Sequence, residues 1–366
     1  MDTPDKSLRA VAVLATGSLA SRILGFVRDI FFAGLLGPAA DLFLVAFRIP
    51  NFFRKLLADG SLGLAFGASG MALASLHGRQ SLNAFSRSVG VRLFLLALVA
   101  SLCLGLLARP LVLLLAPGLP ERETADCVNL VRLCLPYSPF CLLSAIVFSH
   151  LAVSGDFRPQ AWSSLVWNCV ILAVCLFAAC LGPLGLHPST LLLQKMLCAG
   201  VVAGGMVQAL LSLTSLAKAQ KNAGLHAGNT ALILDEKEPG PEAAQAGNPG
   251  LTAEARIRQE ASRFLRQFPA AVLGAASSQI HFLAAMAFAS CITAGGISAL
   301  YLCERLVELP VSLAGGALGF AILPGLAHLA ARGDKQELSQ MLGEGLRRGA
   351  FLSFPATAGL LALAFP

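Results

Sequence analysis

The sequence predicts an all-α polytopic membrane protein, and three observations support this fold class. The chain has 366 residues, of which 56% are hydrophobic and 13% charged, whereas soluble domains contain about 25% charged residues. Its mean hydropathy is +0.73. Nine apolar segments also approach or exceed the length of about 20 residues that a helix needs to cross a bilayer.

The nine segments define the expected helices in chain order. The first follows a polar start, MDTPDKSLRA, and is too long for the apolar part of a signal peptide, so we expect it to stay in the membrane. The second continues through a glycine-rich stretch to about residue 76. The expected spans are approximately 8–35, 41–57, 90–115, 128–154, 160–182, 190–216, 267–292, 296–328 and 345–366.

Basic residues lie on alternate connections, which predicts the orientation. The connections 36–40, 183–189 and 293–295 contain no lysine or arginine, and 116–127 contains only Arg122. The other connections contain basic residues, and we expect them, together with the N-terminus, in the cytoplasm. These residues are Arg79 and Arg87, Arg158, the run from Lys218 to Arg266, and Arg332, Lys335, Arg347 and Arg348. This asymmetry also accounts for the net charge of +7, and we expect no nucleic-acid partner.

One polar segment divides the chain. Its part LDEKEPGPEAAQAGNPG has the composition of a disordered linker. The next part, TAEARIRQEASRFLRQF, fits either an amphipathic helix on the inner leaflet or a solvated lead-in to the next span. We therefore expect a six-helix lobe at 1–216, a cytoplasmic linker at 217–263 and an incomplete three-helix second lobe at 264–366.

Two sequence pairs suggest that the lobes are parallel repeats. LADGSLGLAF at 57–66 is similar to LAGGALGFAI at 313–322, and SRI at 21–23 is similar to SQI at 278–280. Six helices separate the copies, which gives them the same orientation and predicts a site between the lobes. Chance similarity among segments rich in Gly, Ala and Leu is the alternative.

Charged residues inside the apolar segments are the candidate site. A charge near the bilayer centre costs roughly 2.5–3.5 kcal/mol, so such residues usually line a wet cavity or pair with each other. Arg22 and Asp29 share one helix face, and Ser21 and Arg28 share an adjoining face. The remaining candidates are Asp41, Arg48, Arg54, Lys55, Glu304, Arg305 and Glu308.

Three residues near these charges are expected hinges. Gly25 permits a bend or the close approach of another helix. Pro50 and Pro310 each remove an intrahelical hydrogen bond beside the charges. Broken helices of this kind line cavities in transporters.

Two interpretations of the charges remain open. Five arginines and four acids can be counted in this group. Ion pairs that join helices could therefore account for nearly all of these charged residues. Arginine, however, presents a planar fork of donors that suits phosphates and carboxylates. We favour a cavity for an anionic ligand.

The sequence contains no motif of an enzyme or a metal site. Its ten cysteines lie mostly in apolar runs and form no CxxC pair or Cys/His cluster. No phosphate-binding glycine loop, nucleophile elbow or HExxH motif is present. We expect a transporter without a metal or cofactor.

The motifs SRILGFVRD, DLFLVAFRIPNFFRK with ADG, and ERLVELP followed by GALGFAILP resemble the MurJ/MviN lipid II flippases. This family belongs to the multidrug/oligosaccharidyl-lipid/polysaccharide exporter superfamily. The resemblance implies a multi-pass, monomeric protein of the bacterial cytoplasmic (inner) membrane, surrounded by phospholipids. It would carry lipid II, an undecaprenyl-pyrophosphate bearing a sugar–pentapeptide, to the outer leaflet for the cell-wall synthases in peptidoglycan biosynthesis.

The resemblance also implies residue roles. The family arginines that contact substrate fall on Arg22, Arg28, Arg54 and Arg305, and Ser21 matches a neighbouring serine. Supporting acids are Asp29, Asp41, Glu304 and Glu308, with Glu304 where aspartate is expected.

The family fold has fourteen helices around a central cationic cavity, so the nine expected here imply a C-terminal truncation. The alternatives are a cation-coupled exporter of drugs or other solutes in the same superfamily, and an inactive fragment or assembly partner.

Overall fold

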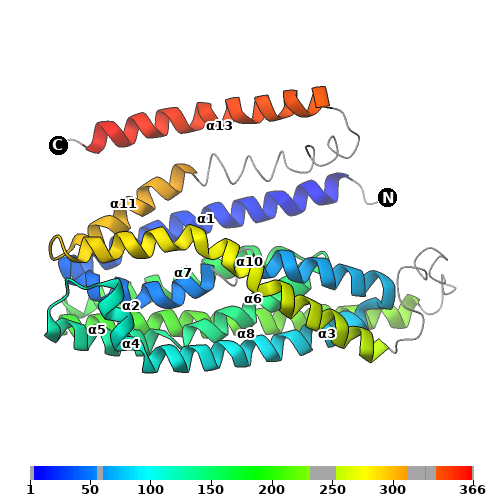
Figure 1. Cartoon of the computed structure of the whole chain (residues 1–366), viewed down its shortest axis with the longest axis horizontal. Coiled ribbons are helices and arrows are strands. Elements are labelled where there is room, and N and C mark those ends of the chain that lie inside the picture. The colour runs from blue at the N-terminus through cyan, green and yellow to red at the C-terminus, as the bar shows by residue number, and fades with distance from the viewer. Residues whose placement is uncertain (1–3, 56–60, 231–252, 312–325, 327–334, 365–366) are drawn as a thin grey trace.

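The computed structural model describes residues 4–55, 61–230, 253–311, 326 and 335–364, and every regular element in these ranges is a helix (Figure 1). The predicted all-α class is therefore confirmed. The helices are α1 (Pro4–Leu36), η1 (Gly37–Ala39), α2 (Ala40–Phe53), α3 (Ser61–Leu106), α4 (Ala108–Leu115), α5 (Glu121–Cys134), α6 (Tyr137–Val153), α7 (Arg158–Leu181), α8 (Thr190–Thr230), α10 (Ala253–Ser290), α11 (Gly296–Val311) and α13 (Lys335–Ala364).

Five helical segments in the described part of the chain are long and apolar enough to cross a membrane. They are Leu19–Phe53, Gly78–Leu106, Glu121–Val153, Arg158–Leu181 and Thr190–Lys221. The first joins α1 and α2 through the 3₁₀ turn η1. These lengths and compositions are those of a multi-pass membrane protein.

The long helix α3 is divided at Gly78, whose φ of 72° lies in the left-handed region, where glycine is favoured. The helical segment that is long and apolar enough to cross a membrane runs over Gly78–Leu106. This helix begins before the span expected from about residue 90, because charged and polar residues between 79 and 88 continue it ahead of its apolar part.

Helices also extend into both ends of the expected linker. α8 continues to Thr230, and α10 already begins at Ala253. On α10, Phe264 is buried beside Phe66 and Phe85 of α3, with ring centroids 6.3 Å away in each case. The amphipathic segment is therefore a helix, which was one of the two alternatives. Its apolar face, however, packs on α3. The middle of the linker lies outside the described residues, as do both LAGGALGFAI and ADG.

The core of the first half is an aromatic series between α2, α6 and α7. Phe47 stacks on Phe43 and Trp167 with centroid distances of 5.8 and 6.0 Å, and Tyr137 lies 5.6 Å from Trp167. α8 can approach this series because it presents glycine there: a Cβ at Gly205 would lie 2.5 Å from Tyr137. Close packing of this kind is what holds helices together in lipid.

The helices run roughly along the long axis of the molecule (Figure 1). The start of α1, the end of α8 and the start of α10 lie at one end, and η1 lies at the other. α13 stands at the edge of the molecule, while α11 contacts α1, α2, α10 and α13. α11 therefore connects the two halves of the chain and brings its charged residues to α1 and α2.

Candidate functional site

The charged residues of α1 and α11 meet in a buried cluster around Asp29. The carboxylate of Asp29 accepts hydrogen bonds from Arg28, including one from Nε at 2.8 Å. From α11, the Tyr301 hydroxyl donates to Asp29 at 3.1 Å, and Arg305 Nε lies 3.1 Å from the same oxygen as an ion pair. Asp29 is fully buried, so these partners offset a desolvation cost of several kcal/mol.

Asn168 of α7 joins Arg28 to Ser21. Its Oδ1 accepts a hydrogen bond from Arg28 Nη1 at 2.9 Å. Its Nδ2 donates to the Ser21 carbonyl at 3.0 Å and hydroxyl at 3.1 Å. Ser21 and Arg28, which the sequence places on one helix face, therefore share a partner that sequence reasoning missed.

Arg48 of α2 makes a second contact with α11. Its Nη1 and Nη2 donate to the two oxygens of Glu304 at 3.2 and 3.5 Å. The two side chains are only 10% and 17% exposed. This forked pair joins residues that are 256 positions apart in the sequence.

Glu308 is the acid with the largest share of positive neighbours. Arg305 contacts it directly, and Arg22 Nη1 lies 4.0 Å away. Lys55 and Arg54 also act on it electrostatically. Both Glu308 and Arg22 keep 41% of their side-chain surface exposed, so this part of the cluster faces open space.

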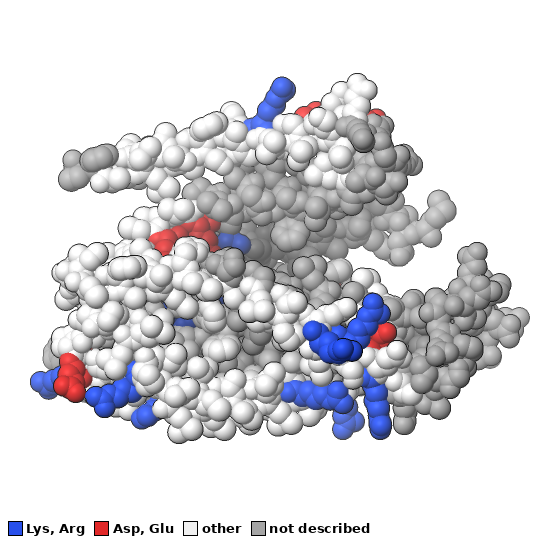
Figure 2. Space-filling model, in the orientation of Figure 1, with Lys and Arg blue, Asp and Glu red and all other residues white. Residues whose placement is uncertain are grey.

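The cluster as a whole has an excess of positive charge. It contains six basic side chains and three acidic ones among the described residues: Arg22, Arg28, Arg48, Arg54, Lys55 and Arg305 against Asp29, Glu304 and Glu308. In Figure 2, acidic and basic side chains meet over α11, between α13 and the bundle. Among the described residues, basic side chains thus outnumber acidic ones in this cluster by three.

Aromatic rings cover several of these guanidinium groups. Arg28 lies 5.0 Å from the centre of the Trp167 ring, and Arg305 lies 4.9 Å from that of Tyr301. Such cation–π contacts are stronger where water is excluded. Sequence reasoning missed both rings. Trp167 is far from Arg28 in the sequence, whereas Tyr301 lies four residues before Arg305 on α11, a helical spacing that could have indicated the contact.

Asp41 lies apart from this cluster, at the start of α11. Its carboxylate accepts hydrogen bonds from the backbone N–H groups of Gly295 and Ser298, each at 2.8 Å, and one from the Ser298 hydroxyl. A carboxylate at this position complements the positive end of a helix dipole. Asp41 therefore closes the η1 end between the two halves instead of supporting the arginines directly.

The expected hinge residues lie within continuous helices. Gly25 faces Asn168, and a Cβ there would be in ordinary contact at 3.6 Å. The close approach occurs about two turns earlier, where a Cβ on Gly17 would lie 2.8 Å from Ala161. α2 continues from Pro50 to Phe53, and α11 ends at Val311, one residue after Pro310.

No group of three or more metal-binding side chains occurs in the described ranges. The chemistry of the site is therefore that of arginine, amide and aromatic groups. These groups can bind and orient an anion, and none is arranged as a nucleophile with a base.

Similarity to known proteins covers nearly the whole chain. The family model described as lipid II flippase MurJ matches residues 27–366. A probable lipid II flippase MurJ of Buchnera aphidicola is 29% identical over 98% of this chain and 64% of its own length. The corresponding protein of Vibrio cholerae is also 29% identical, with 98% and 64% covered. This chain thus spans less than two thirds of the length of these relatives.

Solved structures show the same fold. A lipid II flippase MurJ in an inward closed conformation has a TM-score of 0.69 at 19% identity, over 96% of this chain and 65% of that one. A MATE transporter in complex with MaD3S has a TM-score of 0.55 at 12% identity, over 98% and 72%. From the match of the family model over most of its residues, this chain belongs to the lipid II flippase MurJ family.

Proposed function

We propose that this chain carries lipid II across the bacterial cytoplasmic membrane as a flippase. The observation that supports this most is the excess of positive charge around Glu308, at a place where α1, α2 and α11 meet. Arginine forks suit a pyrophosphate because each can donate two parallel hydrogen bonds to it. The relatives named as lipid II flippases supply the substrate.

Within this proposal the candidate residues have two roles. Arg22, Arg54 and Arg305 contact the pyrophosphate, because each acts electrostatically on the partly exposed Glu308. Arg28 and Ser21 both form hydrogen bonds with Asn168 of α7, and these bonds hold α1 in position. Asp29, Glu304 and Glu308 hold the arginines in place before the anion arrives.

The contacts at the η1 end suggest how access alternates. Asp41 holds Gly295 and Ser298, Gly118 N–H donates to Ser290 at 3.1 Å, and Gln194 donates to the Ala39 carbonyl at 2.6 Å. The first two of these interactions join the two halves of the chain. Opening on this side requires that they break while α11 moves relative to α2, with Pro50 and Pro310 as hinges.

The distribution of charge supports an inward orientation of the N-terminus. Figure 2 shows lysine and arginine gathered where α8 ends and α10 begins. At the opposite end Arg109 and Arg122 are accompanied by Glu121 and Glu123. We infer that the first end is cytoplasmic, and an inside-negative potential then favours export of the anion by about 2.3 kcal/mol per charge per 100 mV.

Several expectations from the sequence stay part of the proposal. These are nine membrane spans, two lobes related as parallel repeats with boundaries at 1–216, 217–263 and 264–366, a monomeric state, and delivery of the product to cell-wall synthases. A cation-coupled exporter of organic cations is disfavoured, because the positive excess of the cluster would repel such a substrate.

A binding measurement tests the proposal. The purified chain in nanodiscs should bind lipid II more tightly than phosphatidylglycerol, which carries a single phosphate and no sugar. Arg22→Ala or Arg305→Ala should weaken lipid II binding by at least about tenfold, the range expected for a charge-assisted hydrogen bond. Arg122→Ala, an exposed arginine at the opposite end, is the matched control. Equal affinity for both lipids would refute the proposal.

A further inference from the structure

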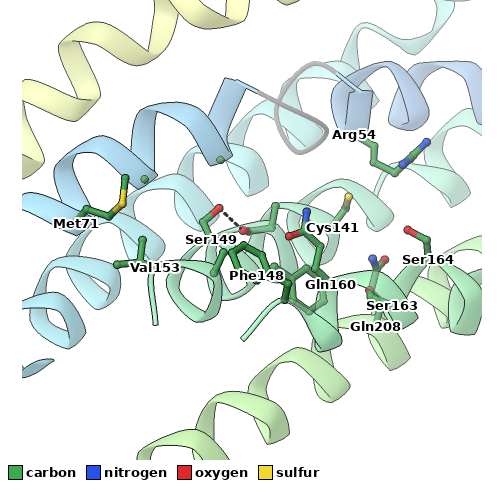
Figure 3. A pocket seen from close by; sticks show the side chains of 15 residues that line it. Arg54, Met71, Cys141, Phe148, Ser149, Val153, Gln160, Ser163, Ser164 and Gln208 are labelled. Atoms are coloured by element: carbon green, nitrogen blue, oxygen red, sulfur yellow. Dashed lines mark hydrogen bonds between the residues drawn. The ribbon is translucent and has the colours of Figure 1, made fainter. Parts of the chain in front are cut away.

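A separate cavity lies inside the first half of the chain, next to Arg54 (Figure 3). Its volume is about 330 Å³. The walls come from the first turns of α3, from α6, from the start of α7 and from α8, and the polar lining side chains are Ser149, Gln160, Ser163, Ser164 and Gln208. The cavity lies outside the cluster around Asp29 and Glu308, and Arg54 is the residue that they share.

Two buried polar atoms on the wall of this cavity have no partner among the described residues. They are the hydroxyl of Ser163 and the amide oxygen of Gln208. These residues are 3% and 9% exposed, and both line this cavity (Figure 3). A buried polar group without a hydrogen bond costs about 1–3 kcal/mol, so such groups are rare unless something else binds them.

The lining indicates what kind of group would bind. Among the described residues that line it, Arg54 is the only charged one and none is a carboxylate, so this part of the wall suits an anion better than a cation. Hydroxyl and carboxamide groups can each donate and accept hydrogen bonds. The matching ligand is an uncharged amide or hydroxyl group attached near a negative charge, with the charge at Arg54.

A second cavity with a mainly apolar lining lies beside the polar one. It has a volume of about 280 Å³, lies between α2, α3, α6 and α10, and is lined mainly by Leu, Ala and Phe side chains. The two cavities share Arg54 and Cys141. Apolar chains therefore have their own space beside Arg54, and the polar cavity is left for a hydrophilic group.

We propose that this polar cavity binds an amide- and hydroxyl-bearing sugar or short peptide portion of the substrate while Arg54 contacts its phosphate. This inference rests on the proposed lipid II function and deepens it. Ligand pockets typically measure about 300–1,000 Å³, so a cavity of 330 Å³ accepts one ring or a short segment and not the whole headgroup.

The test compares two lipids that differ only in the headgroup beyond the phosphates. Kd values for lipid II and for undecaprenyl pyrophosphate are measured with the purified chain in nanodiscs. Gln208→Leu removes the amide at similar volume, and it should weaken lipid II binding by about tenfold, the loss of one hydrogen bond to a buried group. Its affinity for undecaprenyl pyrophosphate should not change.

Two further variants separate binding from folding. Gly67 lines the cavity, and a Cβ there would have no atom within 4 Å, so Gly67→Leu should fill the space without disturbing the helix and give the same selective loss. Gln220→Leu, on the exposed end of α8, is the matched control and should behave as the unmodified chain. Melting temperatures identify variants that fail to fold.

The outcomes distinguish the two proposals. Unchanged lipid II binding in Gln208→Leu and Gly67→Leu would mean that the cavity holds no part of the headgroup. Equal losses for both lipids would mean that these substitutions do not act on the headgroup. Either result would overturn this inference alone. If neither lipid binds in preference to phosphatidylglycerol, the proposed function fails. In that case binding of N-acetylglucosamine 1-phosphate that is weakened by Gln208→Leu would still support the cavity assignment, and its absence would refute it.

Discussion

Arg48 on α2 and Glu304 on α11 form a forked ion pair, with Nη1 to Oε2 at 3.2 Å, between segments 256 residues apart. Both side chains are largely shielded from solvent. A pair in this position links the two halves of the chain beside the positive cluster. Its contribution is testable because each partner can be changed alone or together.

Arg48→Ala should destabilise the protein by roughly 3 kcal/mol, because Glu304 would stay buried without its partner. Glu304→Gln should cost less, since an amide can still accept from Arg48. The exchange of both residues, Arg48→Glu with Glu304→Arg, should recover part of the loss. Thermal unfolding of the detergent-solubilised protein measures this, and additive losses in the exchanged protein would show that the pair is not coupled.

Asp41→Asn should loosen the start of α11. The carboxylate now receives two backbone N–H bonds at 2.8 Å, from Gly295 and Ser298, and an amide replaces a charge with a weaker acceptor. Loss of a helix cap costs about 0.5–2 kcal/mol, so hydrogen exchange at these two amides should accelerate by about 2- to 30-fold. Glu123→Gln, exposed at the same end, is the control. Unchanged exchange would contradict the capping role.

Arg28 and Arg22 should respond differently to alanine. Arg28 is 4% exposed and bonded to Asp29 and Asn168, so Arg28→Ala should lower the amount of folded protein, and lysine should rescue it only partly because it lacks the fork. The side chain of Arg22 is 41% exposed. Arg22→Ala should keep normal abundance and lose lipid II binding. Membrane abundance and binding, measured in parallel, check both, and a collapse of Arg22→Ala would assign it a structural role.

The orientation can be tested with two cysteines in a version without the native ones. A membrane-impermeant maleimide applied to intact cells should label His187→Cys, in a connection without lysine or arginine, and should not label Gln245→Cys, in the linker. After lysis both should react. Labelling of Gln245→Cys in intact cells would reverse the proposed topology.

The sequence by itself determined the fold class and the order of the helices. Runs of about 20 apolar residues leave the backbone no alternative to helices in lipid, and Gly78 or Pro136 then decides where a helix breaks. The charged residues were also visible, because charge in an apolar segment is costly and stands out. Helix ends were predicted less well, since polar stretches such as 253–266 can continue a helix outside the membrane.

Only the tertiary structure decided which charges meet. Asp29 and Asp41 look equivalent in the sequence, yet one binds Arg28, Tyr301 and Arg305, and the other holds the start of α11. Asn168 and Gln208 carry no signal in their local sequence, because their roles come from α7 and α8 packing beside α1 and α6. Side-chain partners that lie more than a hundred residues apart depend on how helices pack, and helical periodicity along one segment contains no information about that packing.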